Sequence, residues 1–474
     1  MRFLIVQVVF FLSLLVCQGC NLAPRYSRPE VTMPTSFRTT SEVGEDEDNI
    51  AWWKGLGDEV LDGLIGKALA NNRDLQVAVW RVKEYLAEYE EVRASLFPQI
   101  AGNSIAVKEK LPINENFLPP GMSPITPDYS LVGTLSYELD FWGQLRNQTS
   151  AAYSEYLAQV EDRKTVVLTL VASVVQSYIT LRQLDLQLEF AKNTLESRKE
   201  SLEIAKDRFE GGLTSKIEVD QALSVYEEAV AAVENYERQI PQQENLICVL
   251  LGESSHEIPR GASLQDMDLP YNVPAGLPSD LLTRRPDILK AENALQAANA
   301  NVGVARAAFF PQVTFAALYG VNSLQLKKLL HKSSTTWAIG GSLLQQIFTG
   351  GALVAQLRVA EAQKKELIFS YQQKILEAFR EVNDALIGLE KSKEIFKAYQ
   401  TQVAALKDYL SLAWYRYYEG QTEYLTVLDA ERHVFDAEIH LASAQADQFL
   451  FLVNLYKSLG GGWVVEADRE VHPE

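Results

Sequence analysis

Three short motifs occur twice in this chain, in the same order and at a nearly constant separation. ASLFPQIAG at 94–102 recurs as AAFFPQVTF at 307–315, YELDFWGQLRNQ at 137–148 as LLQQIFTGGALV at 343–354, and RFEGGLTSKIEVDQA at 208–222 as RYYEGQTEYLTVLDA at 416–430. The separation is about 210 residues each time, which indicates an internal duplication rather than chance. One plan of helices and strands is therefore expected twice.

The N-terminus predicts export and a lipid anchor. Met1 and Arg2 precede an apolar run from Phe3 to Val16, which suits a signal peptide and is too short to span a bilayer. A cut before Cys20 would leave an N-terminal cysteine, as in a bacterial lipoprotein, and an ordinary signal peptide is the alternative. We therefore expect residues 1–19 to be removed and Cys20 to carry the lipid, followed by a linker at 20–50 rich in Pro, Ser, Thr and acidic residues.

Alternating apolar and polar residues predict two strands in each half, after a helix that ends at Phe-Pro-Gln. The clearest segment, 130–141, carries on one face Leu131, Leu135, Tyr137, Leu139 and Phe141. The other segments are 99–109, 312–320 and 336–348, and the last has on one face Trp337, Ile339, Leu343 and Ile347. Alternation alone fits a membrane barrel and a sheet on a soluble core equally. The export signal, and the stretch 165–181, which we interpret as core-facing rather than membrane-spanning, favour the barrel.

A very long helix and a return helix, separated by a glycine turn, follow the strands in each half. From Tyr371 to Tyr417 apolar residues recur at alternating steps of four and three, with Ser392 as the one polar member. The same pattern from Leu181 to Phe209 is interrupted by Arg198, and the return arm at 425–456 follows it more loosely. This is a coiled-coil seam. At 1.5 Å per residue the long arms would be on the order of 100 Å, which does not suit a compact catalytic domain.

Four strands cannot form a membrane barrel alone. They leave two unpaired edges, which hydrocarbon does not tolerate, and known barrels begin at about eight strands. Copies of the chain must therefore contribute strands to a shared barrel. Two copies would close it and three would open a pore, and the sequence does not choose between them.

Composition excludes several other classes of protein. The 474 residues carry a formal net charge of −18, which argues against a nucleic-acid surface, and 3 cysteines provide no disulfide framework. The chain has no G-x-S-x-G, P-loop or H-E-x-x-H motif, so we expect no enzyme and no cofactor. His433 and His440 lie seven residues apart without an evident third ligand, so no metal site is expected.

Six longer stretches carry a resemblance to a known family. They are CNLAPRYSRP at 20–29, WWKGLGDEVLDGLIGKALANNRDLQVA at 52–78, LSYELDFWGQLR at 135–146, GLPSDLLTRRPDILKAENALQAANANVGVARAAFFPQ at 276–312, YLTVLDAER at 424–432 and LVNLYKSLGGGW at 452–463. Through them the chain resembles the TolC-type outer-membrane efflux protein family, in the lipoprotein branch that serves resistance-nodulation-division pumps. The resemblance implies a mixed α and β fold. Each internally duplicated protomer would give four strands to a trimeric 12-stranded outer-membrane β-barrel and long coiled-coil helices to a periplasmic α-barrel.

The resemblance also implies partners and a location. The homotrimer would be lipid-anchored in the outer membrane, extend into the periplasm and connect through a periplasmic adaptor (membrane fusion) protein to an inner-membrane resistance-nodulation-division pump. After the signal and linker, the expected segments are leading helices at 51–96, strands at 97–143, a helical hairpin at 144–250, a belt at 251–283, a second leading helix at 284–308, strands at 309–349, a second hairpin at 350–460 and a tail at 461–474.

The expected functional site of such a duct is its narrowest point, at the tip of the second helical hairpin. By resemblance, Leu425 would form an apolar ring there and Asp429 an acidic ring. The two are i,i+4 neighbours on one helical face, and an acidic ring favours cations. The alternative for Asp429 is a surface carboxylate stabilised by the helix dipole near a helix start.

The function expected is therefore the exit duct of a tripartite efflux system, conducting substrates passively across the periplasm and the outer membrane. A type I secretion channel is the nearest alternative, and a non-porous structural coiled-coil lipoprotein a more distant one. The exported substrate cannot be read from the sequence, because substrate choice usually lies with the pump.

Overall fold

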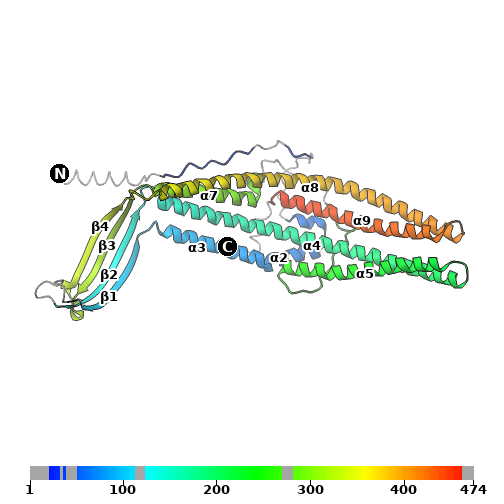
Figure 1. Ribbon diagram of the computed structural model, residues 1–474, viewed down its shortest axis with the longest axis horizontal. Coiled ribbons are helices and arrows are strands. Elements are labelled where there is room, and N and C mark those ends of the chain that lie inside the picture. The colour runs from blue at the N-terminus through cyan, green and yellow to red at the C-terminus, as the bar shows by residue number, and fades with distance from the viewer. Residues whose placement is uncertain are drawn as a thin grey trace. The chain divides into compact units, whose positions relative to one another are not determined.

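The computed structural model describes residues 21–31, 36–38, 51–110, 112, 123–269 and 281–461, and Figure 1 shows them in chain order. The expected signal peptide at 1–19 and the lipid-carrying Cys20 lie outside the described residues. The chain divides into two compact units. Unit 1 comprises Met1–Pro29, Val82–Gln159 and Ala291–Tyr371, and unit 2 comprises Glu30–Arg81, Val160–Lys290 and Gln372–Glu474.

Unit 1 contains one sheet of four antiparallel strands in chain order. The strands are β1 (Gln99–Lys110), β2 (Ile125–Leu139), β3 (Gln312–Ser323) and β4 (Thr335–Leu344). The first half of the chain supplies the β1–β2 hairpin, the second half supplies β3 and β4, and β2 pairs with β3 to join them. In the part of the chain that the structure describes, β1 and β4 each have one strand neighbour only. The predicted mixed fold with four strands is confirmed, and both sheet edges are open.

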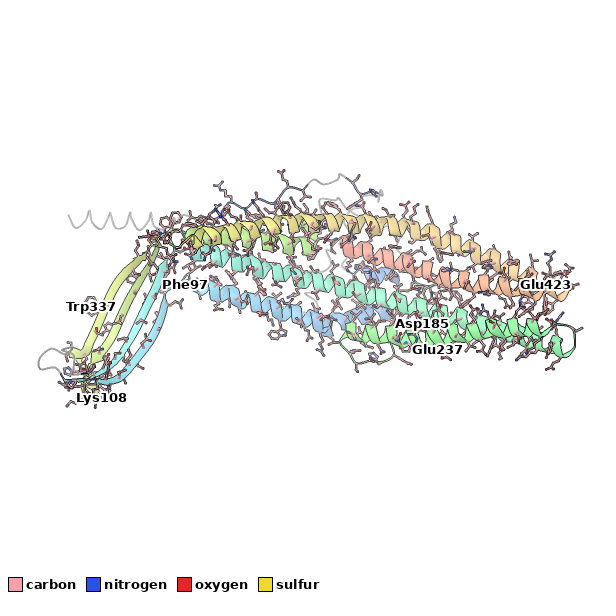
Figure 2. The ribbon with its side chains drawn as sticks, in the orientation of Figure 1. Phe97, Lys108, Asp185, Glu237, Trp337 and Glu423 are labelled. Atoms are coloured by element: carbon pink, nitrogen blue, oxygen red, sulfur yellow. The ribbon has the colours of Figure 1, made fainter. Side chains whose placement is uncertain are left out.

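The register brings most apolar positions of β2, β3 and β4, together with Ile100 of β1, onto one face of the sheet, whereas Ile105 and Val107 of β1 lie on the other face. Leu135 lies opposite Ile100, and Tyr319 lies opposite Trp337, which Figure 2 labels on the strands. Apolar and aromatic members of this face include Ile100, Leu131, Leu135, Tyr137, Phe315, Tyr319, Trp337 and Ile339. The other face carries Asn103, Thr134, Ser136, Glu138, Thr314 and Asn322. The two faces predicted separately for 130–141 and 336–348 are thus one continuous surface.

Strands β2, β3 and β4 have other bounds than expected, and β3 continues to Ser323 rather than ending at 320. β2 begins at Ile125 because it pairs with the full length of β1, and it ends at Leu139, so Phe141 lies outside the strand. The chain turns there toward the next helix. The Trp142 indole stacks on Phe310 with ring centroids 4.7 Å apart and donates through Nε1 to the Pro311 carbonyl at 2.8 Å. At the same end of the sheet, where Leu344 pairs with Gln312, β4 stops, which leaves Ile347 outside the strand.

Helices form most of the rest of the described chain. A short 3-10 helix at Trp52–Leu56 precedes α2 (Glu59–Asn71), α3 (Arg73–Ala94), α4 (Gln144–Glu210), α5 (Lys216–Leu251), α6 (Leu281–Arg284), α7 (Pro286–Ala307), α8 (Ala352–Tyr418) and α9 (Tyr424–Ser458). Two 3-10 turns, Leu326–Lys328 and Lys332–Ser334, lie between β3 and β4. α4 and α8 have 67 residues each, which gives contour lengths of about 100 Å, as expected.

The long seam of α8 is confirmed, because every position from Tyr371 to Tyr417 in the four–three pattern is buried or half-buried. In α4 the final seam residue, Phe209, is 44% exposed and so departs from the prediction. α4 is the one described helix that is long and apolar enough to cross a membrane by length and composition, and 56% of that window is buried in the protein. Buried Val171, Val175 and Tyr178 support the core-facing interpretation of this stretch.

In unit 2, the carboxylate of Asp58 holds three segments together. Its Oδ1 accepts hydrogen bonds from the first backbone N–H groups of α2, and its Oδ2 accepts from the Tyr178 hydroxyl at 2.9 Å and from the Ala262 N–H at 3.0 Å. Burial raises the pKa of Tyr178 to about 12, and Asp58 adds to that rise. Gly261 donates to the Tyr178 hydroxyl, and a Cβ on Gly261 would lie 2.1 Å from Asp58 Oδ1, so only glycine fits there.

Arg285, in the RRPD stretch at 284–287, also has a structural role. It forms two hydrogen bonds with Asp287, donates to the Ser458 carbonyl at the end of α9, and pairs with Glu381 of α8 at 2.8 Å. Burial alone would raise the pKa of Asp287, but the Arg285 guanidinium more than offsets it and holds that pKa below its usual value.

Candidate functional site

The candidate site lies on the first turns of α9, directly after the turn that joins it to α8. Gly420 has φ +69°, and the N–H of Gln421 donates to the Arg416 carbonyl at 2.8 Å, which closes the end of α8. Glu423, labelled in Figure 2, is extended and immediately precedes α9. The left-handed conformation at Gly420 explains why the sequence has glycine here.

Leu425 and Asp429 lie together on the exposed face of α9. Leu425 is 56% exposed and the side chain of Asp429 is 59% exposed, whereas Tyr424 and Leu428 are buried. Asp429 is not in the first turn of α9, where a helix dipole would stabilise a carboxylate most. The exposed position instead leaves both side chains available to an aqueous passage or to another chain.

Asp429 has a histidine partner that the sequence analysis did not assign to it. Its Oδ1 lies 3.4 Å from Nε2 of His433, one turn further along α9, and the His433 side chain is equally exposed. The i,i+4 spacing was visible in the sequence. The pair therefore combines a carboxylate and an imidazole on the same exposed surface as Leu425.

Beneath this surface, α8 and α9 pack against the other hairpin. The shared core contains Leu202, Ala205, Ala222, Val225, Ala413, Tyr417, Tyr424, Val427, Leu428 and Ala430. The Tyr417 hydroxyl donates to Glu218 of α5 at 3.1 Å, and the Arg208 guanidinium lies 4.8 Å from the centre of the Tyr417 ring. The two hairpin tips are thus fixed to one another by an apolar core and by polar contacts at its edge.

Two buried charged groups also lie between α4 and α9. Arg198 is 1% exposed, donates to the Val225 carbonyl at 2.8 Å and lies 3.4 Å from Glu228. Glu431 is 5% exposed and accepts from the Ser201 hydroxyl at 3.0 Å. Burial raises the pKa of the Glu431 carboxyl, although Ser201 and the Arg198 charge oppose that rise.

Glu431 corrects the seam expected for the return arm. The sequence pattern placed Leu425 and Arg432 on the buried line of α9, but both are exposed, and Glu431 is buried instead. The interruption of the α4 seam by Arg198 was the available signal, because a buried guanidinium requires compensating polar groups nearby.

Comparison with known proteins places these features in a family. The outer membrane efflux protein family profile matches residues 64–253 and 277–461. The chain is 37% identical over 461 residues to the solvent efflux pump outer membrane protein SrpC of Pseudomonas putida, covering 96% of this chain and 97% of the relative. It is 33% identical over 458 residues to the cation efflux system protein CusC of Escherichia coli, covering 96% and 98%.

Solved structures agree with the sequence comparison. The CmeC outer membrane channel of Campylobacter jejuni has a TM-score of 0.90 at 25% identity, covering 96% of this chain and 99% of that one. The open state of the MtrE outer membrane channel of Neisseria gonorrhoeae has a TM-score of 0.83 at 30% identity, covering 94% and 99%.

An open-edged sheet with one apolar face, joined to long helical hairpins, defines a protomer of an outer-membrane channel. The chain belongs to the outer membrane efflux protein family. It functions in efflux as an outer-membrane transport duct that extends into the periplasm, not as an enzyme.

Proposed function

We propose that three copies of this chain form a 12-stranded barrel and serve as the exit duct of a tripartite efflux pump. The supporting observation is the pair of open edges, β1 and β4, in the described sheet. Because the four strands alternate in direction, β4 of one copy and β1 of the next would be antiparallel, so the pairing can continue around a ring. Two copies would give an eight-stranded barrel filled by side chains, whereas three give room for a lumen.

The two faces of the sheet fit this assembly. The face with Trp337 and Tyr319, 66% and 70% exposed in the isolated chain, would contact lipid, and the face with Thr134 and Ser136 would line water. The test is native mass spectrometry in mild detergent together with planar-bilayer recording. We expect a mass of three chains and a steady conductance. A folded single chain that conducts no current would contradict the proposal.

We propose Leu425 and Asp429 as the gate of this duct. Both side chains are exposed on one face of α9, and three leucine side chains meeting on an axis would close the passage by excluding water. The neighbouring ring of Asp429 carboxylates would favour cations. His433 would lie beside each carboxylate, at the 3.4 Å separation seen within one chain.

We further propose that Cys20 carries the lipid anchor and that the duct works with a periplasmic adaptor and an inner-membrane resistance-nodulation-division pump. The named relatives are similar to this chain to nearly the same degree, yet one is a solvent and one a cation efflux protein. This favours a duct whose substrate is set by its pump. Uptake of labelled palmitate that persists in Cys20→Ser would contradict the lipidation, and failure of the adaptor to co-purify with the channel after crosslinking would contradict the partnership.

A further inference from the structure

The first residues after Cys20 lie along one face of α7 within unit 1. Arg28 donates to both carboxylate oxygens of Glu292, at 2.9 and 2.7 Å, and the Tyr26 hydroxyl donates to the same carboxylate at 3.2 Å. About two turns further along α7, Asn299 Nδ2 donates to the Pro24 carbonyl at 2.8 Å. We refer to residues 21–28 as the N-terminal strap.

Gly303 completes this face of α7, where the strap comes closest. A Cβ on Gly303 would lie 2.6 Å from the Cβ of Ala23 and 2.6 Å from Nδ2 of Asn147 on α4, so any larger residue would displace the strap or α4. Together with Asn299 and Glu292, Gly303 forms a stripe at steps of four and seven residues, which is one face of a helix. The stripe fixes the strap in place.

A cavity of about 440 Å³ lies between the strap, α4 and α7, within the size range of small-ligand sites. Its lining consists of Asn21, Ala23, Pro24, Arg25, Tyr26, Asn147, Ser150, Ser154, Gln296, Asn299 and Ala300. Most of the polar groups are neutral amides and hydroxyls, Arg25 is the one charged residue of the described lining, and no described lining residue is a carboxylate. The cavity therefore suits a ligand with carbonyl acceptors and some apolar surface.

Two polar atoms of the lining residues lack partners. Asn147 and Asn299 are 3% and 6% exposed, yet Nδ2 of Asn147 and Oδ1 of Asn299 make no hydrogen bond to any described residue. A buried donor and a buried acceptor without partners cost free energy unless a ligand or water satisfies them. Asn147 Nδ2 can donate to an ester or amide carbonyl, and Asn299 Oδ1 can accept from an amide N–H.

The cavity opens next to the first described residue. Asn21 lines it, and Asn21 Oδ1 accepts from the Ala23 N–H at 3.0 Å. Cys20 directly precedes Asn21, and consecutive Cα atoms are about 3.8 Å apart, so groups attached to the Cys20 sulfur and amine are within reach.

We propose that this cavity binds the ester and amide linkages that join the acyl chains to Cys20. The proposal rests on the proposed lipidation. The linkages are uncharged and rich in carbonyl acceptors, which match the amide and hydroxyl donors of the lining, and the acyl chains themselves extend into the membrane. The strap and the cavity together hold the anchor at one fixed position on the protein surface.

The test is photo-crosslinking in the full-length protein in its membrane. Benzoylphenylalanine replaces Gln296 on α7 or, in a second variant, Ser150 on α4, so that the two probes face the cavity from different helices. The control probe replaces Asn301, which is exposed on α7 and does not line the cavity. After irradiation, fragment-ion mass spectrometry should find the probe at 296 or 150 joined to the acylated Cys20 itself, and the probe at 301 not joined to it. A crosslink at residues 21–26 alone, with none at Cys20, contradicts the proposal.

The other outcomes are distinct. An acylated N-terminal peptide with no crosslink at either position overturns the proposal and leaves lipidation intact. An N-terminal peptide without acyl mass overturns lipidation and the proposal together. Crosslinks to free phospholipid that are equal in the original protein and in Cys20→Ser show that the cavity takes a membrane lipid instead, which also overturns the proposal.

Discussion

The two hairpin tips of this duplicated chain have the same backbone turn and different surfaces. Gly212 and Gly420 both have φ +69°, and in each turn the following N–H donates to the carbonyl five residues earlier at 2.8 Å. Counting equal numbers of residues from these glycines aligns Gln221 with Asp429 and buried Val225 with exposed His433.

The comparison separates the glycine turn, which both tips share, from the exposed charged surface, which differs between them. The turn depends on glycine in both repeats, because both need the left-handed conformation. The pair of Asp429 carboxylate and His433 imidazole lies on the exposed face of α9 at the second tip, and the equivalent positions at the first tip are Gln221 and Val225. A duplicated backbone has therefore kept its turn while the proposed gate has been placed on one copy.

The largest effect should follow from removing Asp429, because the equivalent position at the other tip is the uncharged Gln221. Asp429→Ala is expected to abolish most of the cation preference of the channel in planar bilayers, because the acidic ring is lost. Asp220→Ala is the control, since Asp220 is an exposed acid on the other tip and out of register with Asp429. Equal effects of the two variants on cation preference would show that the two tips do not differ in this property, and would contradict the assignment of Asp429 to the gate.

The shared turn predicts equal losses of stability at the two tips. Gly212→Ala and Gly420→Ala should each lower the free energy of unfolding by about 1–2 kcal/mol, from strain in the left-handed conformation. No atom lies within 4 Å of a Cβ built at either glycine, so strain rather than collision sets the cost. Denaturant titration measures both variants, and a loss at one tip alone would show that the turns are not equivalent.

The buried carboxylate of Glu431 predicts that its neutral replacement by glutamine stabilises the protein, to a degree that depends on pH. Because burial raises its pKa in the folded state, the charged form is disfavoured at neutral pH, and the protein gains stability as pH falls and Glu431 binds a proton. Glu431→Gln should therefore raise the free energy of unfolding at pH 7 by about 1 kcal/mol, and the gain should shrink at acidic pH.

Leu223→Gln supplies the matched control for this effect. Leu223 occupies the equivalent position at the first tip, but it is 41% exposed, so its replacement should leave stability unchanged. Thermal unfolding across pH 4–8 compares the two variants. A destabilised Glu431→Gln at pH 7 would show that the charge is favourable where it lies.

The smallest effect is expected from the polar contact between the tips. Tyr417→Phe removes the hydroxyl that donates to Glu218 and should cost about 0.5–1 kcal/mol. Tyr418→Phe, at an exposed neighbouring position, is the control. Hydrogen exchange at the α8–α9 turn should accelerate only in Tyr417→Phe, and unchanged exchange would mean that the apolar core alone holds the tips together.

Local patterns in the sequence were sufficient to predict most of the fold. The proline of each Phe-Pro-Gln motif marked a helix end, alternation at 130–141 marked a strand, and the four–three spacing after Tyr371 marked the buried line of α8. These features depend on the period of one element or on the backbone of one residue, so they can be read without knowledge of the neighbours.

What could not be predicted depends on partners distant in the chain. The buried carboxylate of Glu431 accepts a hydrogen bond from the hydroxyl of Ser201, which is 230 residues away in the chain. Arg28 of the strap donates to Glu292 across 264 residues. Strand β2 is longer than its own alternation suggests because β1 extends the pairing. Periodicity carries no information on such long-range contacts.

The two bare edges of the sheet have a consequence for the life of a newly exported copy. Before it assembles with other copies, such a monomer exposes unpaired backbone groups along β1 and β4 and an aromatic surface, both of which promote aggregation. The unassembled monomer is prone to aggregate, so its lifetime must be short or a chaperone must cover these surfaces. Overexpression of the chain beyond the capacity of that chaperone should yield insoluble aggregates rather than additional assembled channels.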